Sequence, residues 1–246
     1  MPEKTVLVTG GSRGLGLAIA QRLSGAGYRV IAVARSESEP LREAAEEARA
    51  REAGAIHFRA ADLSDIEGLA PLVRGVRKEF GPLHGLVNNA GIGTEGLLAT
   101  MQNPHIEALI RLNTLSPILL TKFVVRGMMA DGAGRIVNLS SIIASTGYSA
   151  LSVYAATKAS MIGFTKSLAR EVGHLGITVN AVAPGFIDTE LTRSMDDEDR
   201  ARIARRSALR RLAEPRDVAA AVEFLMGEGG RSVTGTVLTV DAGNTA

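Results

Sequence analysis

The sequence predicts an α/β fold, namely a doubly wound Rossmann-type seven-stranded parallel sheet with helices on both faces. Short apolar segments alternate with longer segments of helical periodicity along the whole chain. The short segments are apolar throughout rather than alternating, which is typical of strands that helices cover on both faces. We expect these strands at residues 5–9, 29–34, 55–60, 84–88, 135–140, 177–182 and 236–240.

The segment between the first two strands shows why the longer segments are assigned as helices. Leu15, Ala18, Ile19 and Leu23 form an apolar stripe at helical spacing, and Gly27 follows it. Strand–helix alternation of this kind implies right-handed crossovers between parallel strands. In such a sheet the ligand crevice lies beyond the carboxyl ends of the strands, so motifs at those ends are candidate functional residues.

Composition limits the classes of protein to which the chain can belong. Hydrophobic residues make up 46% of the 246 residues and charged residues 22%, so we expect a single domain, residues 1–246, with a sizeable core. The balance of 28 basic against 26 acidic residues does not indicate a nucleic-acid partner. The chain has no cysteine, which excludes disulfides and thiolate metal sites, and we expect no metal.

The N-terminal segment enters an apolar run almost at once, without the basic stretch and long apolar region of a signal peptide. No uninterrupted apolar run approaches the roughly 20 residues of a membrane-spanning helix. We therefore expect a soluble, cytoplasmic protein with no membrane partner.

A glycine-rich motif, "TGGSRGLG" at residues 9–16, follows the first strand and opens the first helix. Gly10, Gly14 and Gly16 allow a tight turn and let a phosphate approach the backbone at the helix N-terminus. A glycine-rich turn without a ligand is the alternative. The position directly after a strand, at the start of a βαβ unit, favours a dinucleotide.

The end of the second strand bears on the choice between NAD and NADP. NAD-binding folds commonly place an acid there for the ribose hydroxyls, whereas an arginine accommodates a 2′-phosphate. Here Ala34 occupies the place of the acid, Arg35 follows, and Arg13 in the glycine loop could reach the same phosphate. We therefore expect NADP(H), the alternative being that both arginines are simply solvated surface residues.

Tyr154 and Lys158 lie four residues apart in "SVYAATKAS", on one face of a predicted helix. A nearby ammonium favours phenolate and so lowers the pKa of a tyrosine, which would let Tyr154 donate and accept protons near neutral pH. The alternative is an amphipathic tyrosine beside a surface lysine. The spacing alone does not separate the two.

These motifs, in order, resemble those of the short-chain dehydrogenase/reductase family, and the resemblance runs from Lys4 to Gly243. Each motif is weak alone, whereas the ordered set at family spacing is highly specific. The set consists of the "TGGSRGLG" loop, Asp62-Leu63, "NNAG" at 88–91, Asn113, Ser141, the Tyr154/Lys158 pair and "PGFIDT" at 184–189.

The resemblance implies a dinucleotide-binding catalytic domain in which Tyr154 gives a proton to a carbonyl oxygen while hydride reaches the carbon. Ser141 would hydrogen-bond that oxygen, Lys158 would hold the nicotinamide ribose and depress the pKa of Tyr154, and Asn113 would anchor a water relay. Ser140 would point to the opposite face of the strand end. The implied cofactor-binding residues are Gly10, Ser12, Arg13, Gly14, Leu15, Gly16, Arg35, Asp62, Leu63, Asn89, Ala90, Gly91, Tyr154, Lys158, Pro184, Gly185, Ile187 and Thr189.

Pro117 interrupts the long apolar helix expected from about residue 104 to 130. A proline at this position cannot donate to the carbonyl of Asn113, four residues back. We hypothesise that Pro117 leaves this carbonyl free for the relay water and kinks the helix; a harmless bend is the alternative.

Two helical segments, residues 106–129 and the helix after Ser152, are apolar around much of their circumference. Such helices bury a second face against another subunit, and the family forms dimers and tetramers through the same pair, so we expect a homotetramer. Residues 189–207 are expected to be the substrate lid. The arginines at the end of this lid and beyond it, Arg202, Arg205, Arg206, Arg210 and Arg211, could meet an acidic partner or a phosphate, or form a solvated charged face.

Within the family the chain is most similar to bacterial 3-oxoacyl-[acyl-carrier-protein] reductases. Those enzymes dock the acidic carrier with basic residues at places that hold Gly132 and Leu175 here, so carrier recognition stays open. The sequence therefore predicts NADPH-dependent reduction of a 3-oxoacyl thioester, on acyl carrier protein or as a small molecule. A sugar, polyol or other secondary-alcohol dehydrogenase and a non-catalytic dinucleotide-binding regulator are the alternatives.

Overall fold

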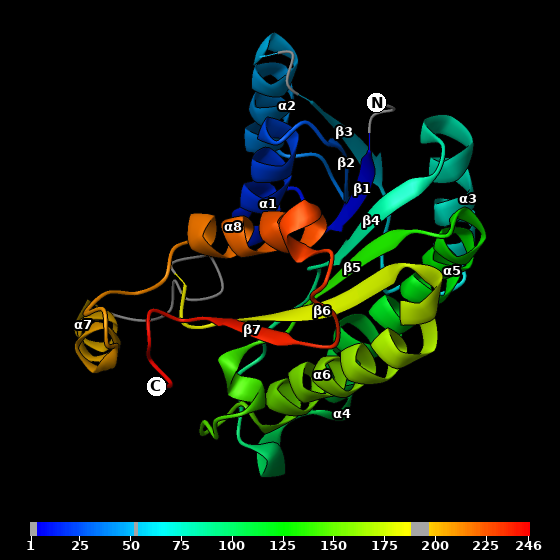
Figure 1. Ribbon diagram of the computed structural model, residues 1–246. Helices are drawn as coiled ribbons and strands as arrows, with labels where there is room; N and C mark the ends of the chain where they lie inside the picture. The colour runs from blue at the N-terminus through cyan, green and yellow to red at the C-terminus, as the bar shows by residue number, and fades with distance from the viewer. Residues whose placement is uncertain (1–3, 52–53, 188–196) are drawn as a thin grey trace.

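A computed structural model describes residues 4–51, 54–187 and 197–246 of the chain. Its centre is a seven-stranded sheet in the order β3-β2-β1-β4-β5-β6-β7, and every neighbouring pair is parallel (Figure 1). The predicted α/β fold with a parallel sheet is confirmed. The strands are β1 (Thr5–Thr9), β2 (Arg29–Ala34), β3 (Ala55–Ala60), β4 (Leu83–Asn88), β5 (Gly134–Leu139), β6 (Ile177–Pro184) and β7 (Val237–Val240).

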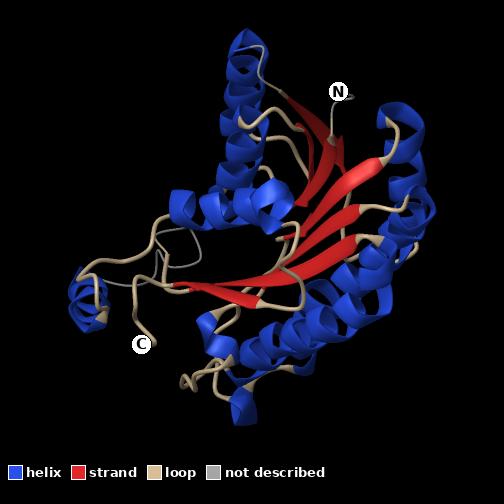
Figure 2. Ribbon diagram, in the orientation of Figure 1, coloured by secondary structure: helices blue, strands red, loops and turns tan. Residues whose placement is uncertain are grey.

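Helices cover both faces of the sheet and enclose two hydrophobic cores (Figure 2). Side chains that alternate along a strand enter opposite cores, so that Val6 and Val8 pack on one side and Leu7 on the other. The first core lies under α1 (Gly14–Gly25), α2 (Glu39–Arg51) and α8 (Pro215–Met226). The second lies under α3 (Leu69–Phe80), α5 (Ser116–Asp131) and α6 (Ser152–Val172).

Burial along the strands follows their place in the sheet. All residues of β1 and β6 are buried, as expected for strands with neighbours and helices on every side. The edge strands β3 and β7 are only partly buried, and β3 carries His57 and Arg59 among its apolar residues. The prediction of helices on both faces of the sheet is confirmed, and burial is most complete along the central strands.

The pairing of β1 with β4 reverses the direction in which the sheet grows. At such a point the loops after the two strands diverge and open a crevice at the carboxyl edge of the sheet. The glycine-rich loop after β1 and the "NNAG" segment after β4 begin next to each other at this crevice, where Asn89 is hydrogen-bonded to Thr9.

The helical segment Asn103–Asp131 corrects one expectation from the sequence. It comprises α4 (Asn103–Ile110), a π-turn, η2 (Arg111–Leu115), and α5, and it is long and apolar enough to cross a membrane by length and composition. An 18-residue window of this segment has a mean hydropathy of 1.4. Scattered polar residues interrupt every apolar run in it but lower this mean only a little. In the fold 44% of this window is buried, and α5 packs against α3 and strands β4 and β5.

Candidate active site

The four predicted catalytic residues come together at the carboxyl edge of the sheet. Ser141 follows β5 and caps the short helix η3 (Ile142–Ala144), Tyr154 and Lys158 lie on α6, and Asn113 lies in the π-turn η2. The side chains of Asn113, Ser141 and Lys158 are only 2%, 9% and 7% exposed. The fold therefore holds three of these polar residues at the boundary of its core.

Tyr154, Lys158 and Ser141 contact one another as the sequence predicts. The Lys158 Nζ atom lies 5.7 Å from the centroid of the Tyr154 ring and donates a hydrogen bond of 2.9 Å to the carbonyl of Leu139, the last residue of β5. The Ser141 hydroxyl is hydrogen-bonded to the Tyr154 phenol, and it also accepts from the backbone N–H of Ile143 at 3.2 Å. This geometry positions a proton donor beside a hydroxyl that can bind the same oxygen.

The electrostatics of this group differ from the sequence expectation. Burial raises the pKa of Tyr154 above its usual 10, and the hydrogen bond from Ser141 only partly offsets this effect. Burial also lowers the pKa of Lys158 to about 8. The expected lowering of the Tyr154 pKa is therefore not found, because desolvation by burial is the largest effect on both groups.

The side chain of Asn113 is held by partners that the sequence did not identify. Its Oδ1 accepts from the backbone N–H of Ile92 at 2.9 Å, and its Nδ2 donates to the Ile92 carbonyl at 2.8 Å and to Thr157 Oγ1 at 3.3 Å. Thr157 is 2% exposed, and its hydroxyl donates to the carbonyl of Tyr154 at 2.7 Å. Thr157 thus links Asn113 to the helix turn that carries Tyr154.

The backbone around Asn113 is a π-turn, in which the N–H of Ser116 donates to the carbonyl of Arg111 five residues back. Pro117 follows directly and has no N–H to donate to the Asn113 carbonyl. The helix is thus interrupted where the sequence predicts a kink. The side-chain amide of Asn113 is bound to Ile92 and Thr157. Its main-chain carbonyl is a separate group, and the hypothesis that this carbonyl binds a relay water stays a prediction.

Two neighbours fix the position of Lys158. A Cβ atom on Gly91 would lie 3.1 Å from Asn113 Oδ1 and 3.7 Å from Lys158 Nζ, so the backbone of the "NNAG" loop passes directly beside both groups. Ser140 is buried, and its hydroxyl donates to the carbonyl of Lys158 at 2.9 Å. Ser140 therefore ties β5 to α6, while Ser141 faces Tyr154.

The glycine-rich loop has the close backbone contacts that the sequence predicts. A Cβ on Gly16 would lie 2.1 Å from the carbonyl oxygen of Gly10, so no other residue fits there. Gly10 has a φ of +66° and Gly14 a φ of +53°, and a Cβ on Gly14 would meet open space at the start of α1. Backbone N–H groups at an open helix N-terminus can hold a phosphate. Ser12 and Leu15 belong to this same loop.

Thr9 is a structural residue of the nucleotide site that the motif analysis missed. Its buried hydroxyl accepts from the backbone N–H groups of Asn89 and Ala90, both at 2.9 Å, and donates to the carbonyl of Val87 at 3.2 Å. The Asn89 side chain donates to the carbonyl of Thr9 at 2.9 Å. The glycine loop and the "NNAG" loop are thus joined before any ligand binds.

The predicted adenosine-binding residues lie at the exposed ends of β2 and β3. Arg13 and Arg35 are exposed. Hydrogen bonds from the backbone and hydroxyl of Ser64 lower the pKa of Asp62, and the nearby guanidinium of Arg35 lowers it further. Leu63 is 6% exposed, and its side chain packs into the second core.

The last predicted motif is only partly described. Pro184 ends β6, and a Cβ on Gly185 would lie 2.6 Å from Asp241 Cβ, so the chain passes close to the end of β7. Ile187 is 5% exposed, belongs to the first core and forms a bridge with Ala213. Thr189, and the lid residues up to 196, lie outside the described part of the chain.

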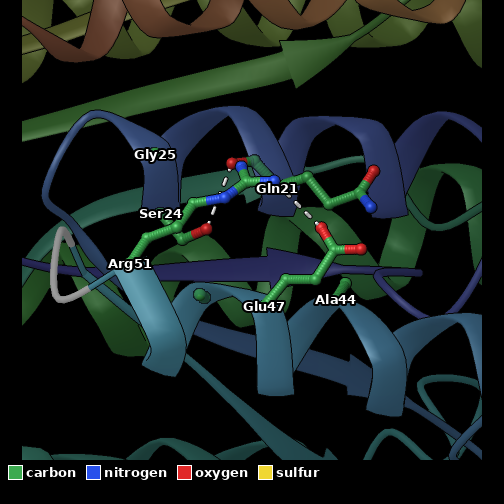
Figure 3. A pocket seen from close by; sticks show the side chains of 7 residues that line it. Gln21, Ser24, Gly25, Ala44, Glu47 and Arg51 are labelled. Carbon is green, nitrogen blue, oxygen red and sulfur yellow. Dashed lines mark hydrogen bonds and ion pairs between the residues drawn. The ribbon is translucent and has the colours of Figure 1, made fainter.

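A pocket away from the candidate active site is lined by none of the predicted site residues. Figure 3 shows it between the C-terminal halves of α1 and α2, lined among others by Gln21, Ser24, Glu47 and Arg51. Its polar groups pair with each other, since Arg51 bonds Glu47 at 3.2 Å and Ser24 donates to the Gln21 carbonyl at 3.1 Å. Among the described residues no group of three or more histidine or acidic side chains could hold a metal ion.

Relatives with curated names match nearly the whole chain. The 3-oxoacyl-[acyl-carrier-protein] reductase FabG of Vibrio cholerae is 40% identical over 98% of this chain and 96% of its own. The FabG protein of Escherichia coli is also 40% identical with the same coverage. An acetoacetyl-CoA reductase of Allochromatium vinosum is 38% identical over 98% of both chains.

Solved structures agree with the fold. A short chain dehydrogenase from Burkholderia cenocepacia in complex with NADP has a TM-score of 0.91 and 38% identity, and the match covers 99% of this chain and 98% of that one. A gluconate 5-dehydrogenase from the same organism, in complex with NADP and tartrate, has a TM-score of 0.93 and 28% identity, with 100% and 96% covered. The family model for short chain dehydrogenases matches residues 4–200. With the geometry described above, these matches show that the chain belongs to the short chain dehydrogenase family.

Proposed function

We propose that this protein is an NADPH-dependent reductase that converts the carbonyl of a 3-oxoacyl thioester to a hydroxyl. Family membership makes it an oxidoreductase of carbonyl and hydroxyl groups, as are its curated 3-oxoacyl-[acyl-carrier-protein] reductase relatives. The observation that carries the proposal is the cluster of Tyr154 with the buried residues Asn113, Ser141 and Lys158 beside the glycine-rich loop. A non-catalytic regulator has no need of all four groups.

The residues of the glycine loop fit a dinucleotide, since Gly14 offers an open helix N-terminus and Gly16 permits the close turn. Bound NADPH supplies the hydride that reaches the carbonyl carbon. Tyr154 donates the phenolic proton to the carbonyl oxygen, and its raised pKa keeps it protonated for this step. Ser141 donates a hydrogen bond to the same oxygen as negative charge develops there.

Lys158 and Asn113 act after Tyr154 has given up its proton: one stabilises the tyrosinate, and the other helps to replace the proton. The Lys158 ammonium, held at the Leu139 carbonyl, would bind the nicotinamide ribose and stabilise the tyrosinate that forms. The Asn113 carbonyl would bind the water through which the proton is replaced. Thr157 and Ile92 hold Asn113 in position for this role.

The exposed end of the site favours NADP over NAD. Arg13 and Arg35 are both exposed at the carboxyl ends of β1 and β2, and Ala34 stands where an acid would repel a 2′-phosphate. Related structures with 34% and 38% identity contain NADPH and NADP.

The loops around the catalytic cluster favour an uncharged acyl group over a sugar acid. The Gly96 N–H donates to the Ala150 carbonyl at 2.9 Å, and the ring of Tyr148 contacts that of Phe186 at 5.8 Å, so three loops meet there. Residues 91–100, 141–153 and 184–187 of these loops contain no lysine or arginine to bind a substrate carboxylate.

A dehydrogenase of a sugar acid or polyol is the second candidate. The observation in its favour is the likeness of the fold to gluconate 5-dehydrogenases, of which one from Beutenbergia cavernae is 33% identical with a TM-score of 0.91. A substrate panel tests the proposal: acetoacetyl thioesters with NADPH on one side, gluconate and polyols with NADP on the other. Turnover of sugars alone would replace the thioester proposal, and no turnover of any carbonyl would support the regulator.

We also propose that the protein is cytoplasmic and assembles as a homotetramer through the α4–η2–α5 segment and α6. Ile110, Leu115 and Met129 on this segment are 48%, 39% and 44% exposed in the single chain, which is unusual for large apolar side chains. Multi-angle light scattering at micromolar protein should show four subunits, and a clean monomer would exclude the assembly.

A further inference from the structure

The helix α7 (Asp197–Arg206) begins with three acidic residues and becomes strongly basic toward its end and in the turn after it. Residues 200–211 contain six arginines and no acidic residue. The segment lies at the same edge of the sheet as the catalytic cluster, because its end is bonded to residues that follow β7. The N–H of Ala208 donates to the Gly243 carbonyl at 3.1 Å and that of Leu209 to the Ala242 carbonyl at 3.0 Å. Figure 1 shows α7 projecting from the body there.

The helix has an inner and an outer face. Ile203 and Ser207, one turn apart, are 8% and 2% exposed and attach the helix to the protein. Arg202, Arg205 and Arg206 have the spacing of a single face, and all three are exposed. The basic charge is therefore concentrated on the side that faces away from the protein.

Four of the six arginines of the segment, Arg200 among them, already have partners. Arg202 pairs with Asp199 at 2.5 Å, and Arg211 pairs with Asp217 at 2.8 Å. Arg210 donates to the carbonyl of Arg205 and so caps the last turn of α7. Within the part of the chain that the structure describes, the side chains of Arg205 and Arg206 have no hydrogen-bond or ion-pair partner.

An apolar side chain accompanies these two arginines. Leu209 is 63% exposed, the highest value among the large apolar residues described, and the backbone bond to Ala242 fixes its position. Leu209 follows Arg206 by three residues in the turn after α7. An exposed leucine close in the chain to unpaired guanidinium groups has the composition of a docking surface, which combines apolar and charged side chains.

We propose that Arg205, Arg206 and Leu209, here called the α7 surface, dock an acidic carrier protein that delivers the acyl thioester. This inference rests on the proposed function. We expect an acidic partner because the guanidinium groups of Arg205 and Arg206 attract negative charge and repel basic surfaces. The partner must present its thioester on an arm, because the α7 surface projects from the body that holds the catalytic cluster. Curated relatives at 40% identity are named for an acyl-carrier-protein substrate.

The test compares three acetoacetyl thioesters as substrates: those of an acyl carrier protein, of coenzyme A and of N-acetylcysteamine. The variant is Arg205→Glu with Arg206→Glu. The matched control is Arg42→Glu with Arg49→Glu, which changes the net charge equally on exposed positions of α2. We expect KM for the carrier thioester to rise at least tenfold in the α7 variant, with kcat unchanged, and the control to stay within about twofold of wild type.

The same variant should reduce the N-acetylcysteamine thioester like wild type, since this substrate carries neither protein nor phosphate. Leu209→Ser should raise KM for the carrier thioester alone, by about threefold. An unchanged KM for the carrier thioester would overturn the α7 surface and leave the proposed function intact. An equal rise for the coenzyme A thioester would assign the arginines to a phosphate and also overturn carrier docking. Failure of wild type to reduce any thioester would instead contradict the proposed function itself.

Discussion

The catalytic cluster and the nucleotide-phosphate end of the same crevice are built in different ways. Asn113, Ser141 and Lys158 are nearly buried and hydrogen-bonded to backbone and side chains of other elements. Arg13 and Arg35 are exposed at the ends of β1 and β2. The proposed catalytic groups are therefore positioned by the fold, whereas the proposed preference for NADP rests on surface charges. Substitutions in the first region should change kcat, and substitutions in the second should change KM for the cofactor.

The largest expected effect is that of Tyr154→Phe, which removes the proton donor but keeps the ring. We expect kcat to fall about 1000-fold, within the usual range for loss of a general acid. Binding of NADPH, measured by fluorescence titration, should change less than threefold. Tyr28→Phe is the matched control, since Tyr28 is also buried and bonds the Met226 carbonyl at 3.2 Å, far from the catalytic cluster. Full turnover by Tyr154→Phe would contradict the proposal that Tyr154 donates the proton.

Lys158→Met should lower kcat/KM about 100-fold by removing the charge that stabilises tyrosinate and binds the ribose. In wild type, kcat/KM for reduction should fall as pH rises through about 8, because the buried ammonium then loses its proton. A profile that stays flat to pH 9.5 would show that Lys158 does not act as a cation in the free enzyme.

The same pKa has a consequence for stability. The pKa of Lys158 lies near 8 in the folded protein and near 10.5 unfolded, so the unfolded state holds more protons between these values. The unfolding free energy of wild type should therefore rise relative to that of Lys158→Met between pH 8 and 10.5, by on the order of 3 kcal/mol. Urea unfolding of both proteins at pH 7.5 and 10 measures this difference. An equal change in unfolding free energy for the two proteins would contradict the lowered pKa of Lys158.

Arg35→Ala and Arg13→Ala should each raise KM for NADPH about tenfold, because each removes one charged partner of the 2′-phosphate. The KM for NADH and the value of kcat should stay within about twofold. A fall in kcat for either variant would contradict the proposal that the surface arginines select the cofactor while the catalytic cluster alone performs the reaction.

Thr157→Ala should have the smallest effect, a decrease in kcat of about fivefold, because it removes the bonds to Asn113 and to the Tyr154 carbonyl without removing a reacting group. KM for NADPH should be unchanged. Thr157→Ser keeps the hydroxyl and should restore kcat to within about twofold of wild type. If serine does not restore it, packing of the methyl group matters instead of the hydrogen bonds.

The sequence predicts the sheet well because its strands are short apolar runs that alternate regularly with helical segments. It locates Tyr154 and Lys158 on one helix face because helical spacing is a local property. The glycine loop is local in part, since Gly10 and Gly14 have positive φ angles, although Gly10 and Gly16 also lie close to the distant residue Asn89. The family motifs then connect these positions in order.

Other features depend on distant segments and could not be read from spacing. Thr9 joins the loops after β1 and β4, and Thr157 joins two helices, through hydroxyl groups that look ordinary in the sequence. The exposure of Arg205 and Arg206, and the pairing of Arg202 with Asp199, follow from how α7 lies on the protein. The same holds for Ser140, whose partner on α6 is 18 residues away.

By itself the sequence determined the order of strands and helices, the glycine-rich turn and the candidate reacting groups, because these depend on periodicity and on side-chain chemistry. Only the tertiary structure decided the protonation behaviour of Tyr154 and Lys158. Proximity of an ammonium predicts a lower pKa for the phenol, but burial raises the pKa of Tyr154 and lowers that of Lys158. The degree of burial is set by the packing of α6 against β5 and η2, which no stretch of sequence contains on its own.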